Sequence, residues 1–247
     1  KKIYEQGMQK FIKNFNSFKK KLNTNLKHVF YESYSGEIGK MFVLENIGKV
    51  FEESDGAVVF KGEKYGLHTR VFLNSERLPT YEAKELGLAN IKNNKHPFDK
   101  SITVTGNEQD AFFKVTEIAI GEVFPQLNSK LHHLSHGMLR LELGSVSNLM
   151  RGNIKRFSEK MSSRTGNIIT AKELIDNVKE KVRVIMEKTN KVSGPALQRG
   201  LDYKIAIAAI KYMILRQGIG QDIIFDFEKS VSTEGDSGVY LQYAHAR

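Results

Sequence analysis

The chain contains no cysteine, which excludes a disulfide framework, a thiolate zinc site and a cysteine nucleophile. The absence is also consistent with a reducing compartment. No apolar run reaches the roughly 18 residues that a membrane span needs, and the first residues lack the apolar core of a signal peptide. The sequence therefore predicts a soluble, cytoplasmic protein with no membrane partner.

Acidic side chains are outnumbered by basic ones. The 247 residues include 38 Lys and Arg against 28 Asp and Glu, which gives a formal net charge of +10. The first 27 residues contain eight lysines and a single acidic residue, Glu5, and so carry +7 of this total. Such a balance favours a polyanionic partner such as a nucleic acid. The remaining composition, 40% hydrophobic and 27% charged, is that of an ordinary globular protein of one large or two small domains.

Residues 1–28 are predicted to form a basic amphipathic helix. Apolar residues recur there every three or four positions, at Met8, Phe11, Phe15, Phe18 and Leu22. Two interpretations remain open: the helix packs through this stripe and its basic face is solvated, or the basic face contacts RNA directly.

Between residues 29 and 158, short β-type runs alternate with helical patterns. The strand-like runs are Ala57–Phe60, Arg70–Leu73, Ser101–Thr105 and Met138–Leu143, and the helical stretches are Tyr81–Ile91 and Glu108–Ile120. Such alternation predicts an α/β sheet with covering helices.

The last third of the chain has a helical pattern. Thr170 and Glu173 form a capping box ahead of an apolar repeat with helical spacing, and a second helical run covers Pro195–Arg216. Apart from the short apolar run Ile223–Phe225, we expect a helical bundle in this region.

Three of the seven histidines, His132, His133 and His136, lie within five residues. Zinc sites usually take three or four ligands from more than one element, and the chain has neither a cysteine nor an HExxH motif. We therefore expect no metal site, and we favour a histidine-lined turn near which a nucleotide could bind.

Glycine-rich phosphate loops of the common kinds are also missing. The chain has neither GxxxxGK[ST] nor a GxGxxG motif after a strand, so the Walker and dinucleotide-binding patterns are excluded. Residues 160–167 instead have the sequence KMSSRTGN, with two cations and three hydroxyl groups ahead of the final Gly-Asn. Taken alone, this segment is as compatible with a solvated turn as with a phosphate-binding loop.

KMSSRTGN resembles the KMSKS-type loop of class I aminoacyl-tRNA synthetases, in the form with arginine in the fifth place that is typical of arginyl-tRNA synthetases. Further stretches resemble the same family in the same order: Glu32-Ser33, SDGA at 54–57, LPTYEAKELGLA at 78–89, GNEQ at 106–109, HLSHGM at 133–138 and EGDSGVYLQYAHAR at 234–247. The resemblance covers residues 29–247. One departure is Arg77, which stands where the family usually has glycine.

This resemblance implies an α/β fold: the second half of a Rossmann-like parallel-sheet catalytic domain, followed by a helical bundle that carries the KMSKS-like loop. We place the domain boundaries at 1–28, 29–158 and 159–247. No His-Ile-Gly-His motif occurs, and the chain ends where a family member would continue into its anticodon-binding domain. The missing N-terminal half of the catalytic domain is therefore an expected partner, and we expect a monomer.

The implied function is ATP-dependent attachment of L-arginine to tRNA(Arg) through an arginyl-adenylate, with the fragment inactive alone. ATP would arrive with Mg²⁺ held mainly by its phosphates, so no tightly bound cofactor is expected. The alternative is a non-catalytic synthetase-like fragment or paralogue that binds tRNA or ATP.

The resemblance also implies which residues form the site. Lys160, Ser162 and Arg164 are expected to stabilise the charge on the departing pyrophosphate. Tyr81 and Glu85, on one helix face, and Gln109 are expected to bind the arginine side chain. The residues expected to bind ATP are His133, Gly137, Met138, Lys160, Met161 and Ser162.

Overall fold

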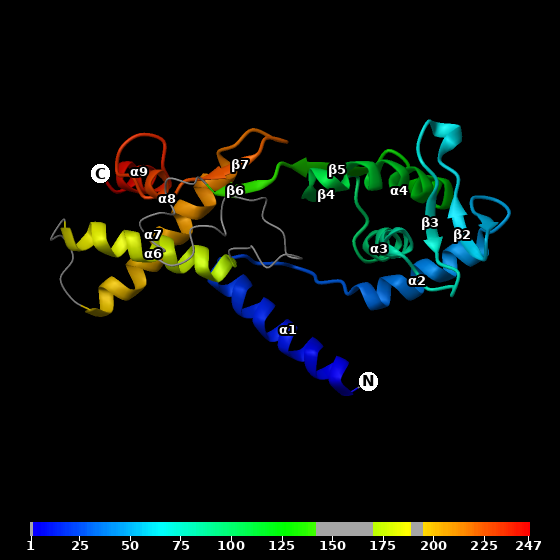
Figure 1. The fold of residues 1–247 in the computed structure, drawn as a ribbon, viewed down its shortest axis with the longest axis horizontal. Coiled ribbons are helices and arrows are strands. Elements are labelled where there is room, and N and C mark those ends of the chain that lie inside the picture. The colour runs from blue at the N-terminus through cyan, green and yellow to red at the C-terminus, as the bar shows by residue number, and fades with distance from the viewer. Residues whose placement is uncertain (1, 142–169, 189–194) are drawn as a thin grey trace. The chain divides into compact units, whose positions relative to one another are not determined.

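The computed structural model describes residues 2–141, 170–188 and 195–247 (Figure 1). The chain divides into two compact units, Lys1–Ser135 and His136–Arg247. This division lies ahead of the predicted boundary at residue 158, which is outside the described residues. No helix in the described part of the chain is long and apolar enough to cross a membrane.

The first unit mixes helices and short strands. In chain order its elements are α1 (Lys2–Lys21), α2 (Glu32–Glu45), β1 (Glu52–Ser54), β2 (Ala57–Phe60), a 3-10 turn (Glu63–Tyr65), β3 (Arg70–Leu73), α3 (Tyr81–Lys95), β4 (Ser101–Gly106), a 3-10 turn (Asn107–Gln109), α4 (Asp110–Val123), a 3-10 turn (Pro125–Leu127) and β5 (Leu131–His136). The predicted strands Ala57–Phe60 and Arg70–Leu73 are confirmed, and α3 starts at the predicted Tyr81 but continues to Lys95.

The helix predicted over residues 1–28 ends at Lys21. Asn23 adopts a left-handed conformation (φ 49°), and its N–H donates to the carbonyl of Lys20 (3.1 Å). The N–H of Thr24 donates to the carbonyl of Lys19 (2.9 Å), which completes a Schellman cap. The apolar stripe of α1 is incompletely covered, since 61% of the surface of Phe11 stays exposed.

β1, β2 and β3 form an antiparallel sheet of their own. Asp55 and Gly56, both left-handed (φ 47° and 78°), make the two-residue turn between β1 and β2. A parallel pair of strands needs a crossover of a dozen or more residues. A two-residue turn between β1 and β2 therefore requires that they pair antiparallel. Of the strands predicted from the sequence, β2 and β3 lie in this sheet, whereas β4 and β6 belong to two other sheets.

β4 and β5 are neighbours in a second sheet and are joined through α4. The N–H of Ser101 donates to the carbonyl of Lys130 (2.8 Å), and four residues later Thr105 lies beside His133, so the two strands run in the same direction. One face of this pair is covered, whereas Ile102 and Val104 on the other face are each 59% exposed.

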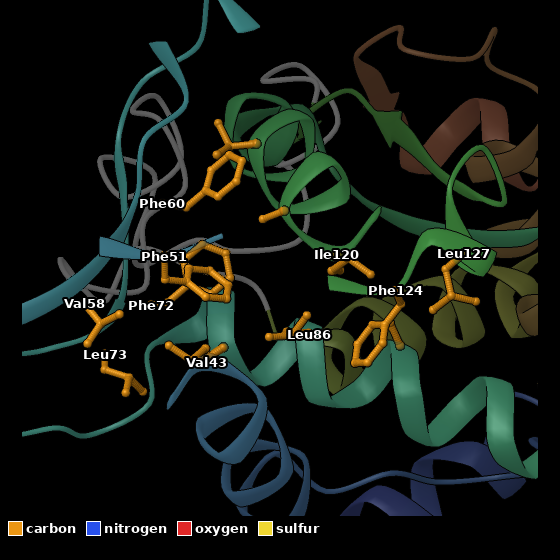
Figure 2. Close-up of a cluster of buried hydrophobic side chains, with 14 residues drawn as sticks. Val43, Phe51, Val58, Phe60, Phe72, Leu73, Leu86, Ile120, Phe124 and Leu127 are labelled. Atoms are coloured by element: carbon orange, nitrogen blue, oxygen red, sulfur yellow. The ribbon is translucent and has the colours of Figure 1, made fainter. Parts of the chain in front are cut away.

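The apolar core of the first unit lies between the antiparallel sheet and helices α2, α3 and α4 (Figure 2). Phe51 and Phe72 meet at a centroid distance of 4.7 Å, and both are completely buried. Leu86 from α3 and Ile120 from α4 extend this cluster toward the β4–β5 pair. The core therefore holds α3 and α4 in place. α3 carries the predicted site residues Tyr81 and Glu85, and α4 directly follows Gln109.

Helices α2 and α3 pack unusually close together. A Cβ atom placed on Gly39 of α2 would stand 1.7 Å from the carbonyl oxygen of Ala83 of α3. A Cβ atom placed on Gly87 of α3 would stand 2.0 Å from the carbonyl oxygen of Ser35. Only glycine fits at these two positions, and the contact fixes the axis of α3 against α2.

The second unit is mainly helical. Its described elements are β6 (Leu139–Leu141), α6 (Ala171–Lys188), α7 (Pro195–Leu215), β7 (Ile223–Phe225), α8 (Phe227–Ser230) and α9 (Gly238–Ala246). The predicted capping box is confirmed: the N–H of Thr170 donates to Glu173 Oε2 (2.8 Å), and the N–H of Glu173 donates to Thr170 Oγ1 (3.2 Å). β6 and β7 are parallel. β6 covers Leu139–Leu141 of the predicted strand Met138–Leu143, and the last two residues of that prediction lie outside the described residues.

Candidate active site

Two of the predicted arginine-binding residues stand on the first turns of α3. Tyr81 is the first residue of the helix and 67% exposed, and Glu85, one turn later, is half-buried. The helix start is tied to the sheet because the hydroxyl of Thr80 donates to the carbonyls of Val71 (2.7 Å) and Phe72 (3.0 Å). The ring and the carboxylate therefore lie on one side of a helix whose position is fixed.

The carboxyl group of Glu85 is in an environment of reduced polarity. Burial raises its pKa, and the nearby charge of Lys92 partly opposes this shift. Burial likewise lowers the pKa of Lys92, whose Nζ donates to Ser101 Oγ (3.1 Å) at the start of β4. A cationic group of a ligand near Glu85 would favour the ionised carboxylate and offset its desolvation.

Tyr81 already has a cation over its ring. The Nζ of Lys84 lies 4.7 Å from the ring centroid and pairs with Glu32 Oε2 at 2.9 Å. Glu32 is part of the Glu32-Ser33 stretch, to which no role could be given from the sequence. The structure shows that it holds the lysine that covers Tyr81, and that the ring face can accept a cation.

Gln109 belongs to a different element from the α3 pair. It is the last residue of the 3-10 turn after β4, it directly precedes α4, and its side chain is exposed. The chain turns here at the carboxyl end of a parallel strand, where ligands of α/β folds commonly bind.

His133 lies on the covered face of β5, and its side chain is 9% exposed. Its Nε2 is 2.8 Å from Thr105 Oγ1, and its Nδ1 is 3.5 Å from Asp110 Oδ1. The ring also stacks on Phe113, with 4.2 Å between centroids. A direct contact of this histidine with the nucleoside stays a prediction, and both of its ring nitrogens already face oxygen atoms of the chain.

Gly137 and Met138 belong to the second unit. A Cβ atom on Gly137 would meet the carbonyl oxygen of Gln221 at 2.3 Å, so glycine lets two backbone segments approach each other here. The N–H of Met138 donates to Asp222 Oδ1 (2.9 Å), and the other oxygen of this carboxylate pairs with Arg140 (3.0 Å). Asp222 thus positions the predicted ATP-binding segment, a role that no sequence pattern indicated.

The predicted loop residues Lys160, Met161, Ser162 and Arg164 lie outside the described residues. Within ranges 2–141, 170–188 and 195–247, no group of three or more His, Asp or Glu side chains is arranged to hold a metal ion. His132 and His136 are exposed on β5, on the face opposite to His133.

Comparison with known proteins agrees with the motif resemblance. Residues 1–227 match the family model described as tRNA synthetases class I (R), catalytic domain. The arginine–tRNA ligase of Borreliella burgdorferi is 33% identical over 234 residues, which cover 91% of this chain and 37% of that protein. The corresponding ligase of Amoebophilus asiaticus is 29% identical over 231 residues, with 92% and 36% covered. The chain thus spans little more than a third of the length of these relatives.

Solved structures show the same fold. Arginyl-tRNA synthetase from Plasmodium falciparum superimposes with a TM-score of 0.76 at 16% identity, over 99% of this chain and 39% of that one. The Thermus thermophilus enzyme gives a TM-score of 0.64 at 22% identity, over 87% and 40%. The predicted α/β fold class is confirmed by this likeness, and the match over residues 1–227 shows that the chain belongs to the family of class I (R) tRNA synthetase catalytic domains.

Proposed function

We propose that the chain is part of an arginine–tRNA ligase that attaches L-arginine to tRNA(Arg) through an arginyl-adenylate, with ATP as the second substrate. The observation that carries this proposal is the family match over residues 1–227. The placement of Tyr81 and Glu85 on one helix face, with Gln109 at the carboxyl end of β4, supports it.

Recognition of arginine requires acceptors for a planar guanidinium with five donors. Glu85 supplies a carboxylate whose ionised form would be favoured by the bound cation, and Gln109 supplies an amide oxygen. Tyr81 supplies a ring whose surface already accommodates the ammonium of Lys84 at 4.7 Å. These three side chains together can distinguish a guanidinium from a neutral side chain.

In the first step, the carboxylate of arginine would attack the α-phosphate of ATP and displace pyrophosphate. Negative charge then grows on the leaving group, and fixed cations stabilise it. We assign this role to Lys160 and Arg164, with the hydroxyl of Ser162 as a further donor and Met161 beside the nucleoside. Gly137 and Met138 complete the proposed ATP site, and Mg²⁺ would travel with the phosphates.

The activity of this chain is proposed to need further protein. The apolar residues Ile102 and Val104 are each 59% exposed on β4, whereas parallel sheets are normally covered on both faces. The missing N-terminal half of the catalytic domain is the partner that we propose for this face. The 247 residues alone should then bind substrate weakly and charge no tRNA at a measurable rate.

The arginine pocket is tested in the full-length enzyme. Gln109→Ala and Glu85→Ala each remove an acceptor for a charged donor, worth about 1.5–3 kcal/mol, and should raise the KM for arginine roughly 10- to 150-fold. Glu37→Ala, which removes an exposed carboxylate from α2, is the matched control and should leave this KM unchanged. Unchanged arginine kinetics in both pocket variants would remove these residues from the site.

The loop assignment gives a different kinetic signature. Lys160→Ala and Arg164→Ala should each lower kcat of ATP–pyrophosphate exchange, because each variant loses about 2–4 kcal/mol of transition-state stabilisation. The KM for arginine should change little. If full-length protein with an intact loop showed no exchange at all in the presence of tRNA(Arg), the alternative of a non-catalytic tRNA- or ATP-binding paralogue would be favoured.

A further inference from the structure

The turn Gly106–Gln109, between β4 and α4, is held at both of its ends by one side chain. Thr105 directly precedes the turn, and its Oγ1 lies 2.8 Å from Nε2 of His133. Asp110 directly follows it, and its Oδ1 lies 3.5 Å from Nδ1 of the same ring. The imidazole therefore contacts both flanks of the turn that presents Gln109.

The position of this imidazole is itself fixed. The ring stacks on Phe113 of α4 with 4.2 Å between centroids and 12° between planes, and the side chain is 9% exposed. Burial raises the pKa of Glu117, one turn further along α4, and the backbone of His133 partly opposes this shift. Contacts of the ring with Thr105 of β4 and with Asp110 and Phe113 of α4 leave it little freedom to rotate.

Each ring nitrogen of His133 faces a side-chain oxygen atom, Oγ1 of Thr105 or Oδ1 of Asp110. Oδ1 of Asp110 is buried and has no hydrogen-bond partner within the described chain, and Nδ1 of His133 is 3.5 Å from it, too far for a short hydrogen bond. The hydroxyl of Thr105 also lies 3.2 Å from the carbonyl of Gly106, the first residue of the turn. The contacts of the ring therefore continue into the backbone of the turn.

We propose that His133 is a positioning residue: its imidazole clamps the two flanks of the Gly106–Gln109 turn and so fixes the direction of the Gln109 amide. This inference rests on the proposed function, in which Gln109 reads the arginine guanidinium. It gives His133 a role that acts through the arginine pocket and not through contact with the nucleoside. A misplacement of a recognition group by about 1 Å is enough to weaken a site by an order of magnitude or more.

The kinetic test uses the full-length enzyme. His133→Phe keeps the ring that stacks on Phe113 but removes both nitrogens, and should raise the KM for arginine about tenfold while the KM for ATP stays within about twofold. His133→Gln keeps an amide near the position of Nε2 and should rescue part of the loss. His68→Phe, the same change at an exposed histidine of the first unit, should have no effect.

A double-mutant cycle identifies the route of the effect. If His133 acts through Gln109, then His133→Phe should raise the arginine KM little further once Gln109 is alanine. Additive effects, or a rise in the KM for ATP in place of that for arginine, would overturn the proposal. If Gln109→Ala itself left the arginine KM unchanged, the arginine pocket of the proposed function would be wrong, whereas the clamp is measured separately.

That separate measurement uses hydrogen exchange in the 247-residue chain. His133→Phe should speed exchange of the backbone amides of residues 106–110 about tenfold relative to those in α3, and His68→Phe should not. Thr105→Val removes one end of the clamp without altering the ring, and should give a smaller change in the same amides even if His133→Phe folds poorly. Unchanged exchange in this turn in both variants would refute the clamp.

Discussion

Replacement of Gly39 by alanine should separate α2 from α3. The added Cβ atom would stand 1.7 Å from the carbonyl oxygen of Ala83 and 2.6 Å from its carbonyl carbon. Since Cβ contacts under 3.0 Å essentially do not occur, the two backbones would have to part by about 1.3 Å at this point. The obstacle is backbone, so no side-chain rotation can relieve it.

The expected cost follows from the packing that this separation disturbs. Overpacking of a well-filled interior typically costs 1–3 kcal/mol, and a clash with rigid backbone lies at the upper end, so we expect a loss of about 3 kcal/mol or more. Gly36 on the same helix is a graded control, because its added Cβ atom would meet only side-chain atoms, Pro79 Cγ at 3.3 Å and Lys84 Cγ at 3.4 Å. Gly36→Ala should cost less than about 1 kcal/mol, since alanine also favours the helix.

Urea denaturation of the 247-residue chain, followed by far-ultraviolet circular dichroism, compares the two variants with Gly87→Ala. Hydrogen exchange in α2 and α3 shows where the loss occurs. We expect Gly39→Ala and Gly87→Ala to lower the stability of the first unit alone and by similar amounts, well beyond the effect of Gly36→Ala. If Gly39→Ala were no more destabilising than Gly36→Ala, the close approach of the two helices would be refuted.

Three further changes test other parts of the chain. Asp202, which is completely buried, accepts from Nε of Arg183 (2.6 Å) and from the N–H of Tyr203 (2.7 Å), so Asp202→Ala should destabilise the second unit by about 1–3 kcal/mol in urea melts, and Asp202→Asn by less. Thr170→Ala removes the capping box with Glu173 and should cost about 1 kcal/mol, with faster amide exchange confined to the first turn of α6. Burial raises the pKa of Glu85, so the folded chain keeps a proton that the unfolded chain has lost, and stability should fall as the pH rises from the ordinary glutamate pKa through the raised one. Glu85→Gln should abolish this fall, as measured by urea midpoints over a series of pH values above the ordinary glutamate pKa.

Local patterns were sufficient to predict most elements, but not how the strands pair. The runs Ala57–Phe60 and Arg70–Leu73 are short, apolar and bounded by turn residues, and both are strands. The antiparallel pairing of Ala57–Phe60 with β1 follows from the Asp-Gly turn at 55–56, whose left-handed residues are a hairpin signal present in the sequence. The helix end at Lys21 had a comparable signal in Asn23, a residue type that tolerates the left-handed conformation of a C-terminal cap.

Contacts between distant residues could not be predicted from spacing. The sequence indicates that His133 is on a strand near the site, but Thr105 and Asp110 lie 28 and 23 residues away on other elements, and only the fold brings them to its ring. Asp222, which holds the N–H of Met138, is still further away in sequence. Arg77 is a simpler case: its φ of 60° lies in the left-handed region, which explains why glycine suits this position in the family that the chain resembles.

The close packing of α2 on α3 links two of the stretches that resemble the family, Glu32-Ser33 and residues 78–89. Glu32, at the start of α2, reaches Lys84 on α3 because the glycines of both helices let their axes approach, and Lys84 in turn covers the ring of Tyr81. An arginine guanidinium that binds to Tyr81 must share this ring with Lys84 or displace it, and Glu32 restrains how far the lysine can move. A separation of the helices at Gly39 would weaken this restraint as well as the core. Gly39→Ala should therefore alter arginine binding in the full-length enzyme, as measured by the KM for arginine, even though Gly39 is not one of the proposed ligand-binding residues.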